Sequence, residues 1–412
     1  MTKLATEILV VGGGAAGLSA ALAASAKKKV TIVDDNPLLG GQIWRAEMGR
    51  ITSPTARQLI DSVNSGKITV VSGARIFALA APNTLLAETP AGRSEIEYEK
   101  LILATGARER FLPFPGWTLP NVFGVGGLQA LVKGGVSVAD KRIVVAGAGP
   151  LLLAVADHLR TKGATIVAIA EQTSTARLNR FAFSLFRSPS KLIQAASLRA
   201  KLRGVPYLTD CWVRSAHGEQ CLDLIDLNRK GKSWKVECDM LACGFNLVPN
   251  IELAVLLGCE IADGCVSVDE FQQTSITNVF CSGEPTGVAG VESSLVEGRI
   301  AGLAAAGDQD AARSLFAKRD KARKFGEALN RAFALRDELK ALADDDTIVC
   351  RCEDVAYGRL TEFDNFRDAK LQTRCGMGPC QGRICGTATQ FLFDWRPGSV
   401  RPPIFPVKME NL

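Results

Sequence analysis

A glycine-rich turn between two short apolar segments constrains the fold of this chain most. Glu7–Val11 is apolar and rich in β-branched residues, which predicts a buried parallel strand. Gly12–Gly17 follows it. Residues 15–26 are alanine-rich and predict a helix, and residues 29–33 predict the next strand, which ends before Asp34. Strand, G-x-G-x-x-G turn, helix, strand and acid in this order predict a βαβ unit that binds a dinucleotide.

Each glycine of such a turn has a physical role. Gly12 permits the tight turn, Gly14 lets the backbone approach a pyrophosphate, and Gly17 lets the helix pack on the strand. The helix N-terminus then faces the phosphates with its free N–H groups. Asp34 is placed to accept hydrogen bonds from the ribose hydroxyls. The residues of this unit expected to contact the dinucleotide are Gly12, Gly14, Ala15, Ala16, Gly17, Asp34 and Asp35.

Three later segments resemble cofactor-binding segments of two-dinucleotide-domain flavoproteins. In those proteins the loop after the ribose acid, here Gly40–Arg45, lies along the cofactor. A strand ending in Ala-Thr-Gly, here 100–106, passes the adenine–ribose half, and a later strand ends in glycine and an acid, here Glu284. Disulfide reductases carry a redox cysteine pair near the first loop, but this chain has no cysteine before Cys211. The resemblance adds Gly41, Gln42, Ala104, Thr105, Gly106, Gly283 and Glu284 to the expected cofactor-binding residues.

A second βαβ pattern begins at Lys141. Its turn contains Gly147 and Gly149, but Leu152 stands at the third glycine position and Pro150 lacks a donor N–H. The pattern has the shape of a nicotinamide domain with an impaired fingerprint. We therefore expect a vestigial domain, so that NAD(P) is not a cofactor. Functional NAD(P)H binding and an ADP-like ligand held structurally are the alternatives.

Five of the twelve cysteines fall between residues 350 and 385. Cysteines grouped in this way form disulfides, bind zinc or hold an iron–sulfur cluster. Structural zinc usually takes C-x2-4-C pairs, and a C-x-C pair is too tight for that geometry. C-x-C followed by C-x4-C, with Gly and Pro in the turn, favours a [2Fe–2S] cluster on four thiolates. Two C-x4-C pairs are available, Cys375/Cys380 and Cys380/Cys385.

Three sequence segments together resemble a known family. They are GGQIW at 40–44, the proline-rich PFPGWTLP at 113–120 and CGMGPCQGRIC at 375–385. Similar segments occur in the A-subunit of opine oxidase, the B-subunit of hydrogen cyanide synthase and the flavoprotein subunit of hydroxyproline dehydrogenase. The last segment resembles the bacterioferritin-associated-ferredoxin-like [2Fe–2S] domain. Because many relatives have Ala at the position of Cys375, the resemblance implies the ligands Cys350, Cys352, Cys380 and Cys385.

The resemblance also implies a function. In this family a partner subunit, itself an FAD-containing amino-acid oxidase, oxidises a C–N bond, and the present type of subunit relays the electrons to an acceptor. An FMN at the partner interface and a small ferredoxin-like subunit are further candidates. A stand-alone NAD(P)H-dependent flavin reductase and a scaffold subunit with a structural nucleotide are the rival interpretations. We expect no catalytic residue in this chain, because His158 and His217 are its only histidines and suit packing or surface roles.

Charge and composition argue against nucleic-acid-binding and membrane-spanning proteins. The net charge of +6 is mild, and three Tyr without aromatic–basic alternation argue against nucleic-acid binding. No apolar run reaches the roughly 18 residues of a membrane span. A strand begins within about six residues of the N-terminus, which predicts no signal peptide. The cysteine content then favours the reducing cytoplasm as the location. The electron acceptor could place the protein at the periphery of the inner membrane.

The expected fold class is α/β, with two Rossmann-like three-layer domains of the disulfide-reductase-like flavoprotein type and a small helical [2Fe–2S] domain. A single charged helix is expected over residues 311–343, and buried packing is expected for the phenylalanines of Phe181–Phe186, with a partner-facing surface as the alternative. The proline-rich C-terminus suggests an extended tail against another surface. The expected domains are 1–115 with 265–310 for FAD, 116–264 for the NAD(P)-like domain, 311–346 for a helical linker, and 347–412 for the cluster domain and tail.

Overall fold

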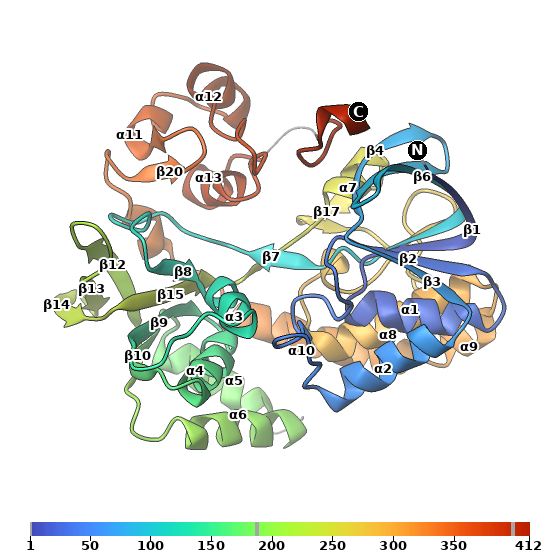
Figure 1. Ribbon diagram of the computed structural model, residues 1–412. Helices are drawn as coiled ribbons and strands as arrows, with labels where there is room; N and C mark the ends of the chain where they lie inside the picture. Colours follow the sequence, from blue (N-terminus) through green and yellow to red (C-terminus); the bar gives the residue numbers. More distant parts are fainter. Residues whose placement is uncertain (1, 186–188, 397–399) are drawn as a thin grey trace. The chain divides into compact units, whose positions relative to one another are not determined.

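The computed structural model describes residues 2–185, 189–396 and 400–412, and they pack into two units (Figure 1). The first unit comprises Met1–Arg108, Val248–Glu327 and Ser399–Leu412. The second comprises Glu109–Leu247 and Ala328–Gly398. These units are defined by packing and not by ligands, so the four expected functional domains remain a prediction.

The first unit is built on a seven-stranded sheet of order β3-β2-β1-β6-β5-β4, with β19 also paired to β6. Its parallel part follows from the first βαβ unit: Val11 pairs with Val33 on one side and with Leu103 on the other. Three parallel strands therefore end at one edge, where ligands bind in such sheets. The strands are β1 (Thr2–Val11), β2 (Val30–Asp34), β3 (Ile68–Ser72), β4 (Arg75–Ala81), β5 (Thr84–Thr89), β6 (Gly92–Leu103) and β19 (Val279–Cys281).

Two helices of this unit, α1 (Ala15–Ser25) and α8 (Val291–Ala305), lie side by side (Figure 1). A Cβ added to Gly298 would lie 2.1 Å from the Ala16 carbonyl oxygen, and one added to Gly302 would lie 2.1 Å from that of Ala20. Glycines spaced by four residues thus let the two backbones touch. The other helices formed wholly in this unit are α2 (Pro54–Ser65), α7 (Glu252–Leu256) and α9 (Gln309–Arg313).

The helix expected over 311–343 is wrong as a single element. After α9, α10 spans Phe316–Ala332, and only a short 3-10 helix follows at Asp337–Ala341. Leu339 and Leu342 are buried in a core cluster of the second unit. The chain therefore follows the surface of that unit instead of continuing the helix.

The second unit contains a five-stranded parallel sheet of order β11-β10-β9-β15-β8 and an antiparallel three-stranded sheet β12-β13-β14. The parallel strands are β8 (Val122–Gly124), β9 (Arg142–Ala148), β10 (Thr165–Glu171), β11 (Tyr207–Thr209) and β15 (Met240–Phe245). The others are β12 (Cys211–His217), β13 (Leu224–Arg229) and β14 (Lys232–Glu237). The helices are α3 (Val125–Lys133), α4 (Leu151–Thr161), α5 (Thr175–Ser184) and α6 (Pro189–Lys201).

The cysteine-rich region of the second unit forms a small lobe around one hairpin. Its elements are β20 (Ile348–Cys350), β21 (Val355–Ala356), α11 (Tyr357–Leu360), α12 (Phe366–Thr373) and α13 (Cys385–Phe393). Trp117 of the proline-rich segment donates its ring N–H to the Ile348 carbonyl at 2.5 Å, which attaches the lobe to the rest of the unit. Two small sheets complete the fold: β7 (Ala107–Glu109) with β16 (Leu247–Pro249), and β17 (Ile261–Ala262) with β18 (Cys265–Val266).

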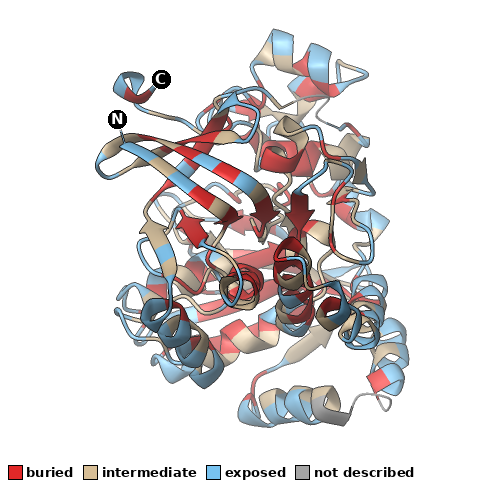
Figure 2. Cartoon of the chain, turned by 90° about the vertical axis from the view of Figure 1, so that its right-hand side faces the viewer, coloured by how far each residue is buried: buried red, intermediate tan, exposed pale blue. Residues whose placement is uncertain are grey.

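Buried residues concentrate on the parallel strands and on the inner helices α1 and α8, whereas the outer helix α5 has none (Figure 2). The expected buried packing of the phenylalanine segment is wrong for Phe183, which is 77% exposed. The C-terminal tail packs on its own unit: Ile404 is buried and its N–H donates to the Phe77 carbonyl. Among the described residues, no helix is long and apolar enough to cross a membrane.

Candidate functional site

The N-terminal glycine turn forms an open cradle at the carboxyl edge of the first sheet. A Cβ on Gly12 would lie 2.2 Å from the Ala104 carbonyl oxygen, and one on Gly17 would lie 1.8 Å from that of Gly12. Packing of the protein itself therefore requires these two glycines. A Cβ on Gly14 would meet only the Gly41 Cα, at 3.8 Å. The space beside Gly14 is free of other atoms of the described residues, as a close approach to pyrophosphate demands.

The carboxylate of Asp34 is buried and oriented by the turn. It accepts hydrogen bonds from the Gly13 N–H at 2.5 Å and from the Asn36 N–H at 2.7 Å. The neighbouring Asp35 is exposed on the surface; desolvation, followed by the Asp34 charge, raises the pKa of its carboxyl. Asp34 is thus held beside the turn in the orientation expected of a ribose-binding acid.

Arg45 is a candidate that the sequence reasoning missed. Its guanidinium donates to the Gln42 side-chain oxygen at 2.9 Å and to that of Asn36 at 3.3 Å. Its Nε is buried and has no hydrogen-bond partner within the described protein. A buried donor of this kind usually has a partner, and an anionic or hydroxyl-bearing ligand would supply one. Because the signal is a side-chain orientation, it could not be read from the sequence.

The strand-end residues Ala104, Thr105 and Gly106 lie beside the same turn, because the Ala104 N–H donates to the Val11 carbonyl. The hydroxyl of Thr105 donates to the Asn250 carbonyl at 2.6 Å, and the Asn250 amide donates back to the Thr105 carbonyl. The Thr105 side chain therefore supports the loop.

The buried carboxylate of Glu284 is only partly hydrogen-bonded by the described residues of the first unit. One oxygen accepts from the Gly290 N–H at 3.1 Å, and the other is buried without a hydrogen-bond partner among the described residues. Burial raises the pKa of Glu284 to about 7. The turn before it is fixed by Glu297, which accepts from the Gly283 N–H and from the Arg323 guanidinium. A side chain at position 283 would not fit, because a Cβ added to Gly283 would lie 2.8 Å from the Ala16 Cβ.

These features fit a flavin dinucleotide in three respects. The cradle at Gly14 is open, the acid at Asp34 is oriented, and Arg45 and Glu284 each have a buried polar atom without a partner in the described part of the chain. The buried first turn of α1, with Ala15 and Ala16, leaves its N-terminus uncapped by any side chain. Such an N-terminus favours a phosphate.

Glu284 should make flavin binding pH-dependent. A ribityl hydroxyl that donates to the free oxygen prefers the carboxylate, so binding favours deprotonation. With a pKa of about 7 in the free protein, the FAD affinity should rise about tenfold from pH 6 to pH 8. The stability of the flavin-free protein should change in the opposite sense. The raised pKa contributes stability below the ordinary value of 4.5, and this is lost as the pH rises through about 7.

Quenching of FAD fluorescence on titration of the flavin-free protein measures this dependence. Glu284→Gln is the matched control, since the amide still accepts a hydrogen bond but does not titrate. The variant should bind FAD with a nearly constant affinity over the same range. Equal slopes for wild type and variant would remove Glu284 from the flavin site.

The second dinucleotide fold differs from the first at its turn. Leu152 is buried in the core between α4 and the sheet. At the corresponding position of the first unit, even a Cβ would lie 1.8 Å from a backbone oxygen. Therefore α4 cannot approach its turn as closely as α1 does. Glu171, the acid at the end of β10, accepts hydrogen bonds from the N–H groups of Gly149 at 2.8 Å and Thr173 at 2.9 Å. Burial raises its pKa to about 7.

The five C-terminal cysteines converge in the lobe around β20. The sulfur atoms of Cys350, Cys375 and Cys385 are buried and lie within 4.8 Å of one another. Cys380 interacts with Cys385 and with the exposed Cys352. The five thiols are thus connected through neighbouring pairs. Cys375, which the resemblance leaves out of the ligand set, is a member of this group in the structure.

Backbone N–H groups surround the sulfur atoms. Gly376 and Glu353 donate to Cys350, whose pKa is lowered to about 2, chiefly by the thiols of Cys375 and Cys385. Gly382 and Ile384 donate to Cys380, and the Cys385 thiol is the main cause that lowers the pKa of Cys380 to about 5. The glycines permit this arrangement: a Cβ on Gly378 would lie 2.1 Å from the Cys352 Cβ.

This donor set fits an iron–sulfur cluster. It consists of thiols alone, and iron–sulfur clusters are held by thiolates. Backbone N–H groups directed at sulfur stabilise the thiolate form and tune such centres. The type of cluster and its four ligands are not set by the geometry alone, because five thiols are present.

Ser215, His217 and Asp226 come together on β12 and β13, which the sequence reasoning did not anticipate. The ring Nε2 of His217 lies 2.8 Å from the Asp226 carboxylate and 2.9 Å from the Ser215 hydroxyl. A catalytic triad needs the acid on one ring nitrogen and the nucleophile on the other. Here both partners contact the same nitrogen, so the group is a surface hydrogen-bond cluster.

Comparison with known proteins gives one family match that spans most of the chain. Residues 6–309 match the family model described as pyridine nucleotide-disulphide oxidoreductase. Among curated proteins, hydrogen cyanide synthase subunit HcnB of Pseudomonas aeruginosa is 31% identical over 320 residues, which cover 71% of this chain and 69% of HcnB. The A-subunit of opine oxidase from Rhizobium meliloti is 29% identical over 434 residues, which cover 93% of this chain and 82% of the relative.

Solved structures share the fold. L-proline dehydrogenase from P. horikoshii superposes with a TM-score of 0.72 at 18% identity, over 100% of this chain and 80% of that chain. Thioredoxin reductase from T. acidophilum superposes with a TM-score of 0.58 at 20% identity, over 74% of this chain and 99% of that chain. The expected arrangement of two Rossmann-like folds is therefore confirmed.

Proposed function

The chain is a flavin-dependent oxidoreductase of the pyridine nucleotide-disulphide oxidoreductase family, in the group of HcnB and the opine oxidase A-subunit, and from that premise we propose that it is the electron-accepting subunit of a hetero-oligomeric amino-acid dehydrogenase. Its partner would be an FAD-containing, amine-oxidising subunit that acts on an opine, hydroxyproline or glycine. The chain would pass the electrons to a respiratory acceptor. The names of the relatives, each a subunit of an oxidase or synthase, support this proposal.

Two cofactor sites of different chemistry support the relay. FAD would be held by Gly14, Asp34 and Glu284, and a [2Fe–2S] cluster by the four cysteines Cys350, Cys352, Cys380 and Cys385. A flavin accepts two electrons together and the cluster accepts one at a time, so a chain that binds both connects two-electron oxidation to a one-electron acceptor.

The protein's own residues have a positioning role in this account. Glu297 and Arg323 fix the turn that carries Glu284. Around the cysteines, neighbouring thiols and, to a smaller extent, backbone N–H groups lower the pKa of Cys350 and that of Cys380. The observation that carries the proposal is that one chain contains both an open dinucleotide cradle and a cysteine group, in which three sulfur atoms lie within 4.8 Å of one another and Cys380 and Cys352 adjoin them.

The visible and electron paramagnetic resonance spectra of the purified chain test this assignment. We expect flavin bands, an additional broad absorbance from the cluster, and an S = 1/2 signal after reduction with dithionite. NADH in stoichiometric amount under anaerobic conditions should leave the flavin oxidised. Rapid bleaching by NADH would support the stand-alone reductase instead, and a colourless protein would support the scaffold.

A further inference from the structure

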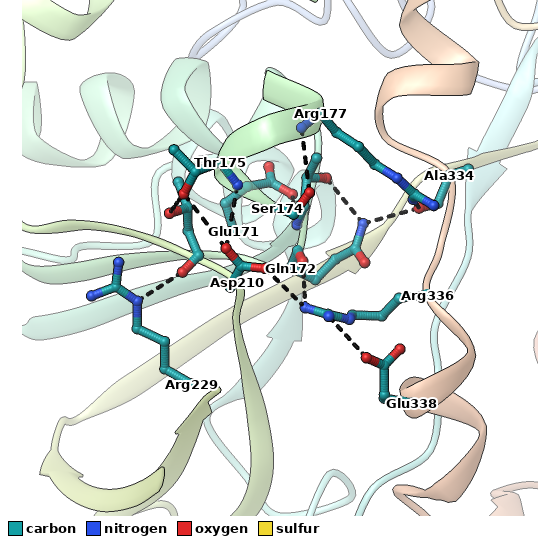
Figure 3. Close-up of polar contacts among 12 residues, drawn as sticks. Glu171, Gln172, Ser174, Thr175, Arg177, Asp210, Arg229, Ala334, Arg336 and Glu338 are labelled. Carbon is teal, nitrogen blue, oxygen red and sulfur yellow. Dashed lines mark hydrogen bonds and ion pairs between the residues drawn. The ribbon is translucent and has the colours of Figure 1, made fainter. Parts of the chain in front are cut away.

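The second dinucleotide site is covered by a segment of the same unit. In folds of this type the ligand lies beyond the carboxyl ends of the strands, across the glycine turn. Here Ala332–Arg336, which is the last residue of α10 and the four residues after it, runs over the ends of β9, β10 and β15. Figure 3 shows this segment beside the strand ends, with Ala334 and Arg336 directed toward Gln172.

Phe333 lies beside Gly149, where the pyrophosphate of a dinucleotide would approach the glycine turn. It is 5% exposed, and its ring packs edge-on against Phe181 at 5.6 Å between centroids. A Cβ added to Gly149 would lie 3.9 Å from the Phe333 ring. Gly149 is the second glycine of the fingerprint, whose bare backbone normally faces the pyrophosphate. At Gly14 of the first unit the corresponding neighbour among the described residues is the Gly41 Cα at 3.8 Å, a backbone atom and not an aromatic side chain.

Backbone carbonyls of the segment accept hydrogen bonds from polar side chains around the site. The Asn246 amide donates to the Phe333 carbonyl at 3.0 Å. The Ala334 carbonyl accepts from the Gln172 amide at 3.4 Å and from the Arg177 guanidinium at 3.3 Å (Figure 3). These are side chains at the ends of β10 and β15 and in the first turn of α5, where a nucleotide would otherwise find its partners.

Arg336 anchors the end of the segment. Its guanidinium donates to the Gln172 carbonyl at 3.1 Å and lies 3.6 Å from Asp210 and 2.8 Å from Glu338. The same group stacks over the Trp212 ring at 4.5 Å. An arginine held by charges, a carbonyl and an aromatic face is costly to displace.

We propose that Ala332–Arg336 is an internal occupant of the second dinucleotide site and that it excludes nicotinamide dinucleotides by competition. The segment is tethered, so its effective concentration at the site is high, and a free nucleotide must displace it to bind. This inference goes beyond the proposed electron relay and does not depend on it. It attributes the exclusion of nicotinamide dinucleotides to a bound segment, whereas the sequence pointed to the substitution at Leu152.

Nucleotide binding to opened variants of the full-length protein tests the competition. Phe333→Ala and Arg336→Gln remove the aromatic group and the anchor, and Arg331→Gln, at an exposed position in the last turn of α10, is the matched control. Isothermal titration with NADH and with ADP-ribose should show an affinity about tenfold or more higher in the double variant Phe333→Ala/Arg336→Gln than in wild type. The control should bind as wild type does. A folded double variant with no gain in affinity would overturn the proposal and assign the exclusion to Leu152.

Hydrogen–deuterium exchange of the wild-type protein tests the competition between segment and nucleotide if the opened variants do not fold. Amides of 332–336 should be protected without nucleotide. Millimolar ADP-ribose that slows exchange in the turn around Gly149 should at the same time speed exchange in 332–336, because the segment is displaced. Slower exchange at that turn with 332–336 as protected as before, or a segment that exchanges freely from the start, would contradict the proposal.

Discussion

Replacing Cys385 with serine is expected to abolish or severely distort the iron–sulfur cluster, whereas replacing Cys375 with serine should preserve it. Cys385 is at the centre of the thiol group, in contact with Cys350, Cys375 and Cys380. Without it the cluster would keep only three of its four protein thiolates, and a serine oxygen is a harder and poorer ligand for iron. We expect the iron content of Cys385→Ser to fall by half or more.

Iron and sulfide analysis, with the spectrum of the reduced cluster, measures this outcome. Cys375→Ser is a demanding control, because Cys375 is buried and its sulfur lies within 4.8 Å of those of Cys350 and Cys385. If Cys375→Ser lost the cluster and Cys385→Ser retained it, the ligand role would belong to Cys375. The same pair of variants therefore tests the ligand set that the family resemblance implies.

Gly14→Val is expected to yield a folded protein that contains little or no flavin. The first atom of the new side chain would meet only Gly41 at 3.8 Å, so the protein's own packing tolerates it. The remaining atoms would fill the space that the pyrophosphate needs. The flavin content should fall by about tenfold or more, which corresponds to a loss of about 1.4 kcal/mol or more in binding free energy.

Two other glycines separate loss of flavin from loss of the fold. Gly17→Ala would place a Cβ 1.8 Å from the Gly12 carbonyl oxygen and should destabilise the whole unit. Gly127→Val adds a side chain with no atom within 4 Å of its Cβ, and it should keep both fold and flavin. Flavin absorbance per protein and thermal unfolding of the flavin-free forms measure the two effects. A Gly14→Val protein with full flavin content would show that the site assignment is wrong.

The sequence predicted those parts of the fold that depend on local patterns. The βαβ register from Glu7 to Asp34 and the clustered cysteines follow from periodicity, turn chemistry and spacing.

Features that depend on long-range contacts escaped prediction. Phe333 lies 184 positions after Gly149, and no local pattern could bring the two together. The orphaned nitrogen of Arg45 and the unpaired oxygen of Glu284 are orientations of side chains, which sequence periodicity does not encode. The tail was expected against another surface, and it packs on β4 because Ile404 finds a hydrophobic site there.

The source of the electrons is the central claim, and reduction of the cluster within the assembled complex tests it most directly. The chain would be co-expressed with an amino-acid oxidase-like subunit, and the complex mixed anaerobically with the partner's substrate or with NADH while the reduced-cluster signal is followed. We predict that the substrate reduces the cluster and that NADH does not, and that the isolated chain reacts with neither. Turnover of the substrate by the isolated chain at the rate of the complex, or reduction by NADH as fast as by the substrate, would contradict the relay.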